Sequence, residues 1–191
     1  MSEDPEDISP KERHRAKRGG EPTGRSPVDD PEARWESLLA RAGCDRSVIA
    51  HARAVTSVAL SFTGNPLADR ELVRAGAMLH DIGRGVTHGI SHAQRGADIA
   101  RSYGLDPRIV SIIERHIGAG LTADECSLER LLPRDCVPVT LEEKIVANAD
   151  NLVHGKREAG IGDTLAGAIR LKKRVRHRIY RLYLEMEAFR G

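Results

Sequence analysis

Apolar residues recur at steps of three and four along nearly the whole chain from Pro31 onward. Val48, Ala52 and Val55 show this spacing, which is that of one face of an α-helix, and Gly64-Asn65-Pro66 is typical of a helix end. No segment alternates apolar and polar residues as a half-buried strand does. The spacing therefore predicts an all-α fold, a compact helical bundle.

Residues 1–30 have a different composition. They contain acids, bases, Pro, Gly and Ser but almost no large apolar side chain, so ordering them would cost more conformational entropy than burial returns. We expect a disordered N-terminal tail over 1–30 and one domain over 31–191, which suits a chain of 191 residues. The last element of that domain is expected to be a basic amphipathic helix over about 163–188.

Charge and cysteine content exclude several classes of protein. Thirty Lys and Arg against 28 Asp and Glu give a formal net charge of +2, so the average charge indicates neither a nucleic-acid partner nor an acidic membrane surface. No apolar run approaches the roughly 18 residues that cross a bilayer, so no membrane association is expected. The 3 cysteines form no C-x-x-C pair, which argues against a disulfide scaffold and a thiolate zinc site and favours the reducing cytoplasm.

Histidine and aspartate stand where the helical spacing places apolar residues. His51 shares the face of Val55, and His116 that of Ile112. A single inward histidine is more often a hydrogen-bonded core residue than a ligand, but a buried carboxylate must be paired, protonated or bound to a cation. Mixed imidazole and carboxylate ligands suit Fe, Mn, Co, Ni or Zn. The sequence therefore predicts a divalent metal site, and the candidate ligands are His51, His80, Asp81, His92, His116 and Asp150.

The order of four of these residues resembles the HD-domain superfamily of metal-dependent phosphohydrolases, whose signature is H…HD…D. His51 comes first, His80-Asp81 follows within Leu-His-Asp-Ile-Gly, and Asp150 lies within Ala-Asn-Ala-Asp-Asn-Leu, at intervals of 29 and 69 residues. The resemblance covers about residues 46–155, and the flanking sequence is similar to an uncharacterised, largely archaeal branch. It implies a helical bundle of the HD-domain type.

The resemblance also implies a set of ligands. One subset of the superfamily has two further histidines before the final Asp and holds two ions, and the six-ligand set here is similar to that of the HD-type symmetrical dinucleoside tetraphosphate hydrolases. By this similarity the second ion would be bound by His92 and His116, and Asp81 would bridge the two ions. The first ion would be bound by His51, His80, Asp81 and Asp150. Two ions are favoured over one.

The activity that the resemblance implies is hydrolysis of a phosphate mono- or diester, with a nucleotide as the expected small phosphorylated substrate. Metal-activated water would attack phosphorus, because a pair of ions lowers the pKa of water and stabilises the charge on the phosphoryl oxygens. His80 and Asp81 are expected to take part in catalysis as ligands. Arg84, directly after the Leu-His-Asp-Ile-Gly segment, is a further candidate for catalysis and for binding the substrate.

Three other residues are weaker candidates for binding substrate phosphate. Lys144 and Arg115 each lie on a predicted helix that also carries a ligand, and the alternative for both is a solvated helix face. His88 lies in the glycine-rich 83–90 segment, where it either protonates a leaving oxygen or faces water.

Two other functions remain open. Some six-ligand HD proteins are diiron oxygenases, and the sequence barely separates them from the hydrolases. The other alternative is a non-catalytic RNA-binding or regulatory module, since the last predicted helix is rich in Lys and Arg with no acid before Glu185. The alternative for that helix is an ordinary solvated face opposite Val175 and Ile179.

Overall fold

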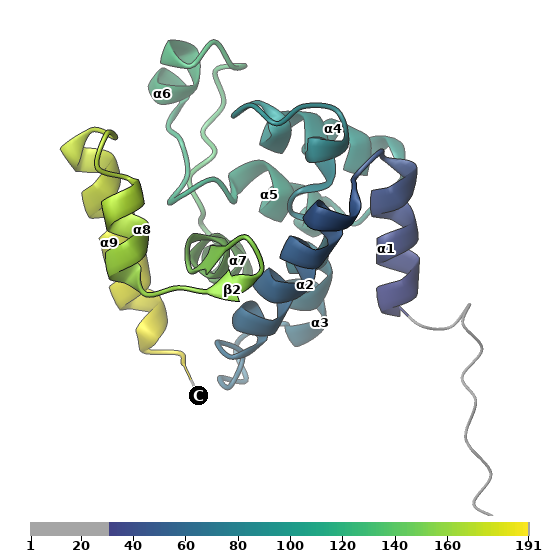
Figure 1. The fold of residues 1–191 in the computed structure, drawn as a ribbon, viewed down its shortest axis with the longest axis horizontal. Helices are drawn as coiled ribbons and strands as arrows, with labels where there is room; N and C mark the ends of the chain where they lie inside the picture. Colours follow the sequence, from purple (N-terminus) through teal and green to yellow (C-terminus); the bar gives the residue numbers. More distant parts are fainter. Residues whose placement is uncertain (1–30, 191) are drawn as a thin grey trace, which may run out of the picture.

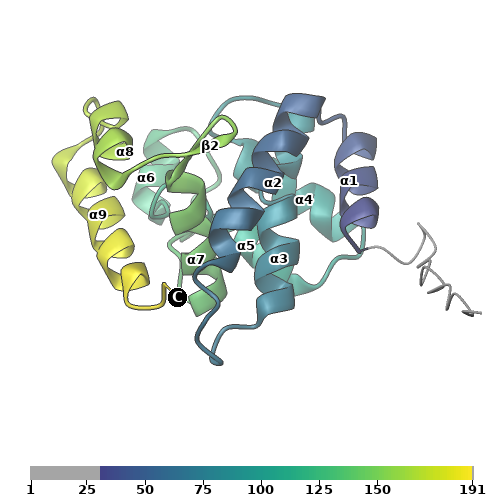
Figure 2. The same cartoon turned by 60° about the horizontal axis from the view of Figure 1, so that its bottom comes forward.

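The predicted all-α fold is confirmed in a computed structural model that describes residues 31–190. Apart from one short hairpin, the regular elements of these residues are helices, arranged around a central group with α1 at one end and α9 at the other (Figures 1 and 2). The disordered tail predicted for 1–30 lies outside the described residues. Among those described, no helix combines the length and apolar character that crossing a membrane requires.

The first half of the bundle follows the helices that the spacing predicts. Asp45, Asp69 and Asp106 each cap a helix, because their side chains accept hydrogen bonds from backbone N–H groups of the first turn. The elements in this half are α1 (Pro31–Arg41), α2 (Arg46–Leu60), α3 (Arg70–Leu79), the 3-10 helix η2 (Ile82–Gly85), α4 (His92–Ser102) and α5 (Pro107–Arg115).

The second half contains shorter elements. A capping box formed by Thr140 and Glu143 opens α7, and a second one formed by Thr122 and Glu125 opens α6. Strands β1 and β2 pair antiparallel, with Val153 opposite Glu158. The elements are α6 (Ala123–Leu128), α7 (Leu141–Asn151), β1 (Val153–His154), β2 (Arg157–Glu158), α8 (Ile161–Gly167) and α9 (Lys173–Glu187).

The single helix expected over about 163–188 is two helices in the structure. Helix α8 ends at Gly167, a residue with low helix propensity, and the chain then turns back so that α8 lies beside α9 (Figures 1 and 2). The turn brings Ile161 and Leu165 of α8 against the same apolar core as Val175 of α9. One continuous helix would carry the apolar side chains of α8 away from that core.

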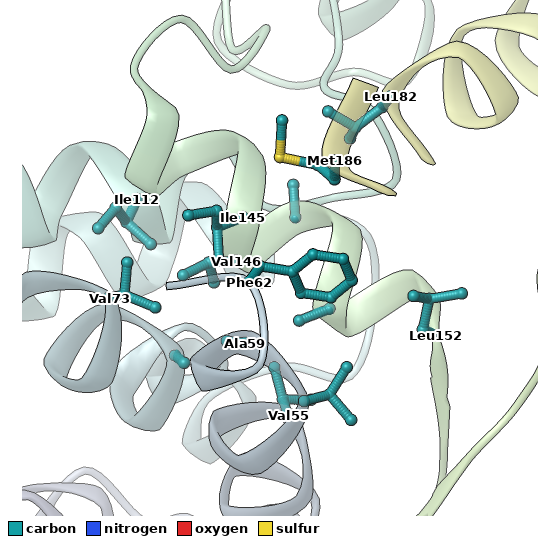
Figure 3. Packing of buried hydrophobic residues seen from close by; sticks show 14 of the residues in the cluster. Val55, Ala59, Phe62, Val73, Ile112, Ile145, Val146, Leu152, Leu182 and Met186 are labelled. Atoms are coloured by element: carbon teal, nitrogen blue, oxygen red, sulfur yellow. The ribbon is translucent and has the colours of Figure 1, made fainter. Parts of the chain in front are cut away.

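Two apolar clusters hold the bundle together. The larger one joins α2, α3, α5, α7 and α9 around Phe62, Ile145 and Met186, which are fully buried (Figure 3). The smaller one includes Leu39 and Leu79 and joins α1, α2, α3, α4 and α5. Burying one such side chain contributes about 1.5–3 kcal/mol, so together the clusters fix the relative positions of the helices that carry the candidate ligands.

Candidate metal centre

The six candidate ligands of the sequence lie together, although they come from five separate parts of the chain. They form three overlapping groups in which the ligand atoms of each group all lie within 4.8 Å of one another. His51 is on α2, His80 caps the end of α3 and Asp81 follows it, His92 begins α4, His116 caps the end of α5, and Asp150 is on α7.

Asp81 occupies the middle of the cluster, and its two oxygens face different histidines. Oδ1 lies 3.1 Å from His92 Nε2 and 3.6 Å from His116 Nε2. Oδ2 lies 3.6 Å from His80 Nε2 and 3.9 Å from His51 Nε2. One carboxylate therefore contacts two pairs of imidazoles, one pair at each oxygen.

Asp150 completes the group on the Oδ2 side of Asp81. Its Oδ1 lies 3.0 Å from His51 Nε2 and 3.4 Å from His80 Nε2. The side chains on this side number four, two imidazoles and two carboxylates, whereas the other side has His92, His116 and the second Asp81 oxygen. His116 also lies within 4.8 Å of both His80 and Asp150, so the two sides are in contact, and the assignment of the six residues to two ions stays a prediction.

All four imidazoles are oriented by backbone carbonyl groups. Each Nδ1 lies 2.7–2.8 Å from a carbonyl oxygen, and because a carbonyl can only accept, each Nδ1 must donate its proton. In the neutral imidazole the lone pair is then on Nε2, which faces the cluster. The four carbonyls belong to Gly155 for His51, Ala77 for His80, Gly89 for His92 and Ile113 for His116.

The inward nitrogens and oxygens suit a bound cation. His80 Nε2 is buried and has no hydrogen-bond partner in the protein, and the Nε2 atoms of His92 and His116 lie only 3.0 Å apart. When the four imidazoles are neutral, four lone pairs and two carboxylates converge, and Arg84, which donates to Asp81 Oδ2, is the cation that contacts them among the described residues. A divalent ion with borderline ligand preference suits this set of ligands, so the residues fit the metal that the sequence predicts.

Burial and neighbouring charges shift the pKa values of several residues in the cluster. His80 is fully buried, which opposes its charged form, but Asp81 and Asp150 outweigh this and raise the pKa of His80 to about 9. Burial likewise opposes the Asp81 and Asp150 carboxylates, yet the neighbouring histidines hold the pKa of both well below the usual range. Burial lowers the pKa of His116. Both carboxylates are therefore ionised at neutral pH, as metal ligands must be, and a bound cation would replace the protons of the histidines.

A hollow of about 330 Å³ opens on the His51 and Asp81 side of the cluster. Arg84 lines this opening, and its Nε donates to Asp81 Oδ2 at 2.7 Å. His88 is exposed on the same rim, and its carbonyl oxygen lies 3.4 Å from Arg84 Nη1. Lys156 also lines the hollow.

The structure does not bring the other two phosphate-binding candidates to this opening. Lys144 forms an ion pair with Glu185 at 2.7 Å and lines a different hollow. Arg115 donates to Val137 O at 3.0 Å and pairs with Glu143 at 3.3 Å. Both cations pair with carboxylates instead. Lys144 lies six positions before Asp150 on α7, and at that spacing the two side chains point to different sides of the helix.

Sequence reasoning missed Lys156 and Ser47 at the opening. Lys156 lies in the turn between β1 and β2, where Gly155 has a φ of 66°. The sequence signal for Lys156 was the Gly155-Lys156 pair shortly after Asp150, because a glycine at this position is typical of the turn in a β-hairpin. Ser47 has no such signal, since it is an ordinary first-turn residue of α2.

An all-helical bundle with H, HD and D residues meeting at one buried centre defines the HD-domain class of fold. The model of the HD domain family matches residues 48–154, more than half of the chain, and this chain belongs to that family.

The curated relatives are archaeal and bacterial proteins. The uncharacterized protein MJ0778 of Methanocaldococcus jannaschii is 46% identical over 128 residues, which are 64% of this chain and 75% of that protein. A tRNA (cytidine(56)-2'-O)-methyltransferase of Thermoplasma volcanium is 48% identical over 120 residues, 63% of this chain but only 36% of the enzyme. A ribonuclease Y of Frankia casuarinae is 51% identical over 47 residues, 24% of this chain and 7% of the relative.

Among solved structures, the HD domain of the Listeria monocytogenes phosphodiesterase PgpH has the same fold. The TM-score is 0.51 at 17% sequence identity, and the match covers 84% of this chain and 98% of that domain. The same domain in complex with cyclic-di-AMP gives a TM-score of 0.50.

Proposed function

We propose that this protein is a metal-dependent phosphohydrolase that cleaves a phosphate mono- or diester of a nucleotide by attack of metal-activated water. One observation carries the proposal: the Asp81 carboxylate lies between two pairs of histidines that all present Nε2 to it. Such a site suits two ions, which supply Lewis acidity and a water of lowered pKa when bound. One would be held by His51, His80, Asp81 and Asp150, and the other by His92, His116 and Asp81.

The protein's own groups at the opening suit an anionic substrate. The Arg84 guanidinium is partly exposed beside Asp81, where it is placed to bind a phosphoryl oxygen and to orient the ester. Lys156 adds a point charge on the rim, and His88 is placed to donate a proton to a leaving oxygen. A hollow of about 330 Å³ is at the small end of ligand pockets, so it suits a single nucleotide unit.

The comparisons support a nucleotide-containing substrate. The solved HD domain with the same fold belongs to a phosphodiesterase and was determined with cyclic-di-AMP. The relatives named ribonuclease Y and tRNA methyltransferase act, by their names, on RNA. We assign hydrolysis and not methyl transfer to this chain, because its converging imidazoles and carboxylates are metal ligands and it spans about a third of the methyltransferases.

The three buried cysteines carry no disulfide, which accords with the reducing cytoplasm that we propose as the compartment.

The test is a phosphate-release screen on protein purified without chelator. Nucleotides, cyclic dinucleotides, short RNA and bis(p-nitrophenyl) phosphate are incubated with Mn, Fe, Co, Ni, Mg or Zn, and bound metal is measured by elemental analysis. We expect Asp81→Asn to abolish turnover and reduce bound metal while the helical circular dichroism persists. The matched control is Asp98→Asn, an exposed carboxylate on α4 outside the cluster. Turnover retained in Asp81→Asn would overturn the proposal.

The second candidate is a diiron oxygenase, because six nitrogen and oxygen ligands without thiolate also suit iron. It predicts dioxygen uptake by the iron-loaded protein and a diiron Mössbauer signature. Phosphate release with manganese or zinc, without dioxygen uptake, would exclude it.

A further inference from the structure

A second hollow, of about 520 Å³, lies between α7, α9 and the 137–138 segment. Its lining includes four Lys and Arg side chains, Lys144, Arg174, Arg178 and Arg181, and we call it the basic hollow. It shares no lining residue with the opening of the metal cluster. The phosphohydrolase proposal leaves this part of the molecule unused.

The cations of the basic hollow follow one face of α9. Arg174, Arg178 and Arg181 are four and three residues apart, which places them on the same side of a helix. At 1.5 Å per residue this row is about 10 Å long, longer than a single phosphate group. Ile179, Leu182 and Met186 are the buried side of the helix. Arg174 and Arg181 are exposed, whereas Arg178 is half-buried and its Nη2 also donates to Gly120 O at 2.7 Å.

The Lys and Arg side chains of the basic hollow outnumber the carboxylates that pair with them. The Glu125 carboxylate pairs with two arginines. Its Oε1 lies 3.2 Å from Arg174 Nε, and its Oε2 lies 2.7 Å from Arg178 Nη2. Glu185 Oε1 forms an ion pair with Lys144 Nζ at 2.7 Å. Within the described part of the chain, Arg181 has no ion pair, and the same holds for the neighbouring cations Arg170, Lys172, Lys173 and Arg176.

The positive charge of the whole protein is concentrated here. Eight Lys and Arg side chains, the four of the hollow and their four neighbours, stand against Glu125 and Glu185, an excess of six positive charges. Because the chain as a whole has a formal net charge of +2, all its other residues together have a net charge of −4. Grouping like charges raises the energy of the folded protein, so the arrangement is one that a polyanion would stabilise.

The basic hollow is also partly apolar. The apolar residues of the lining are Ala119, Val137, Pro138 and Leu182. A strand with unpaired bases can place phosphates along the cations and a base against such side chains, whereas a duplex buries its bases in the stack. The combination favours a single strand over a duplex.

We propose that the basic hollow binds the phosphate backbone of a single-stranded nucleic acid. Binding does not depend on the metal cluster, so the proposal goes beyond the phosphohydrolase function. The strand contacts Arg174 and Arg181 first, because Arg181 has no ion pair and Arg174 shares its carboxylate.

The test measures binding of fluorescent 12-residue oligouridylate and oligodeoxythymidylate to the full chain in chelator, from 50 to 300 mM salt. Two phosphate contacts on a single strand correspond to a salt slope of about 1.4, and at 0.1 M salt to about 25-fold in affinity. We therefore expect Arg174→Gln/Arg181→Gln to weaken binding by about 25-fold and to reduce the slope by about 1.4.

The matched control is Arg34→Gln/Arg95→Gln, which removes two exposed arginines, one on α1 at the opposite end of the molecule from α9 (Figure 1). It is expected to bind like the unmodified protein, and thermal denaturation of both variants checks folding. Equal affinity of the Arg174/Arg181 variant would overturn the proposal, as would tighter binding of a duplex or complete competition by equimolar pyrophosphate. Failure to hydrolyse phosphate esters would leave binding intact, so the two proposals fail separately. A preference for RNA or DNA identifies the source of the strand.

Discussion

At the scale of single residues, Asp81 pairs with the most members of the ligand cluster. Its two oxygens face different imidazole pairs, and one of them also accepts a hydrogen bond from Arg84. Removing a ligand on one side should therefore disturb one cation position more than the other.

We expect His51→Gln and His92→Gln each to reduce bound metal from about two ions per chain to about one, since each variant removes one ligand from one side of the cluster. Asp81→Asn should affect both positions. Elemental analysis after gel filtration measures the ratio, with Asp98→Asn as the control. A single ion in the unmodified protein, lost equally in both histidine variants, would contradict the division into two positions.

Arg84 should affect turnover more than metal content. Arg84→Gln removes a donor at the opening without removing a ligand, and losing such a donor typically costs about 100-fold in kcat. Metal content should stay the same or rise, because the guanidinium occupies the Asp81 oxygen that faces His80 and His51. Arg84→Lys should restore part of the activity, since it keeps the charge but not the bidentate geometry. A parallel loss of metal in Arg84→Gln would contradict a role in binding substrate.

At the scale of elements, the site depends on how closely η2 approaches α4. A Cβ atom on Gly83 would lie 2.0 Å from His92 O and 2.6 Å from Gly96 N, so the two backbones are in direct contact there. This contact holds the turn that carries Asp81 beside the first residue of α4, His92.

Gly83→Ala is expected to lower the free energy of unfolding by about 3 kcal/mol or more, because backbone atoms must move to admit the methyl group. Urea denaturation measures the change, and bound metal should fall with it. Gly162→Ala is the control, since a Cβ on that helical glycine meets nothing within 4 Å and alanine favours a helix. Equal stability of the Gly83 and Gly162 variants would show that α4 and η2 move apart freely.

At the scale of the whole molecule, the six candidate ligands connect most helices of the bundle. They come from α2, the end of α3, α4, the end of α5 and α7, and the unfolded chain cannot hold them together. A cation bound only by the folded state should therefore stabilise the entire fold.

Metal at 100 times its Kd should stabilise the protein by about 2.7 kcal/mol, which for a chain of this size raises the Tm by about 5–10 °C. Differential scanning fluorimetry with and without metal measures the shift, and chelator should reverse it. Asp98→Asn should keep the shift and Asp81→Asn should lose it. An identical shift in Asp81→Asn would place the stabilising ion elsewhere.

Most of the bundle was predictable because helical periodicity is a local property. The caps at Asp69 and Thr140 and the inward direction of His51 and His116 follow from spacing within a few residues. The six ligands were predictable as a set because their order along the chain resembles a known family. The separation of α8 from α9 was not, since Gly167 is a weak signal and the turn depends on the core that α8 packs against.

Partners far apart in the sequence could not be read from it. Lys144 and Arg115 were expected at the substrate, but they pair with Glu185 and Glu143, while Lys156 lies at the opening instead. A cation on a helix surface has several acids within reach of its flexible side chain, and the packing of distant helices selects among them. Local spacing thus established which side chains point inward, whereas the meeting of the helices established which charged groups stand beside them.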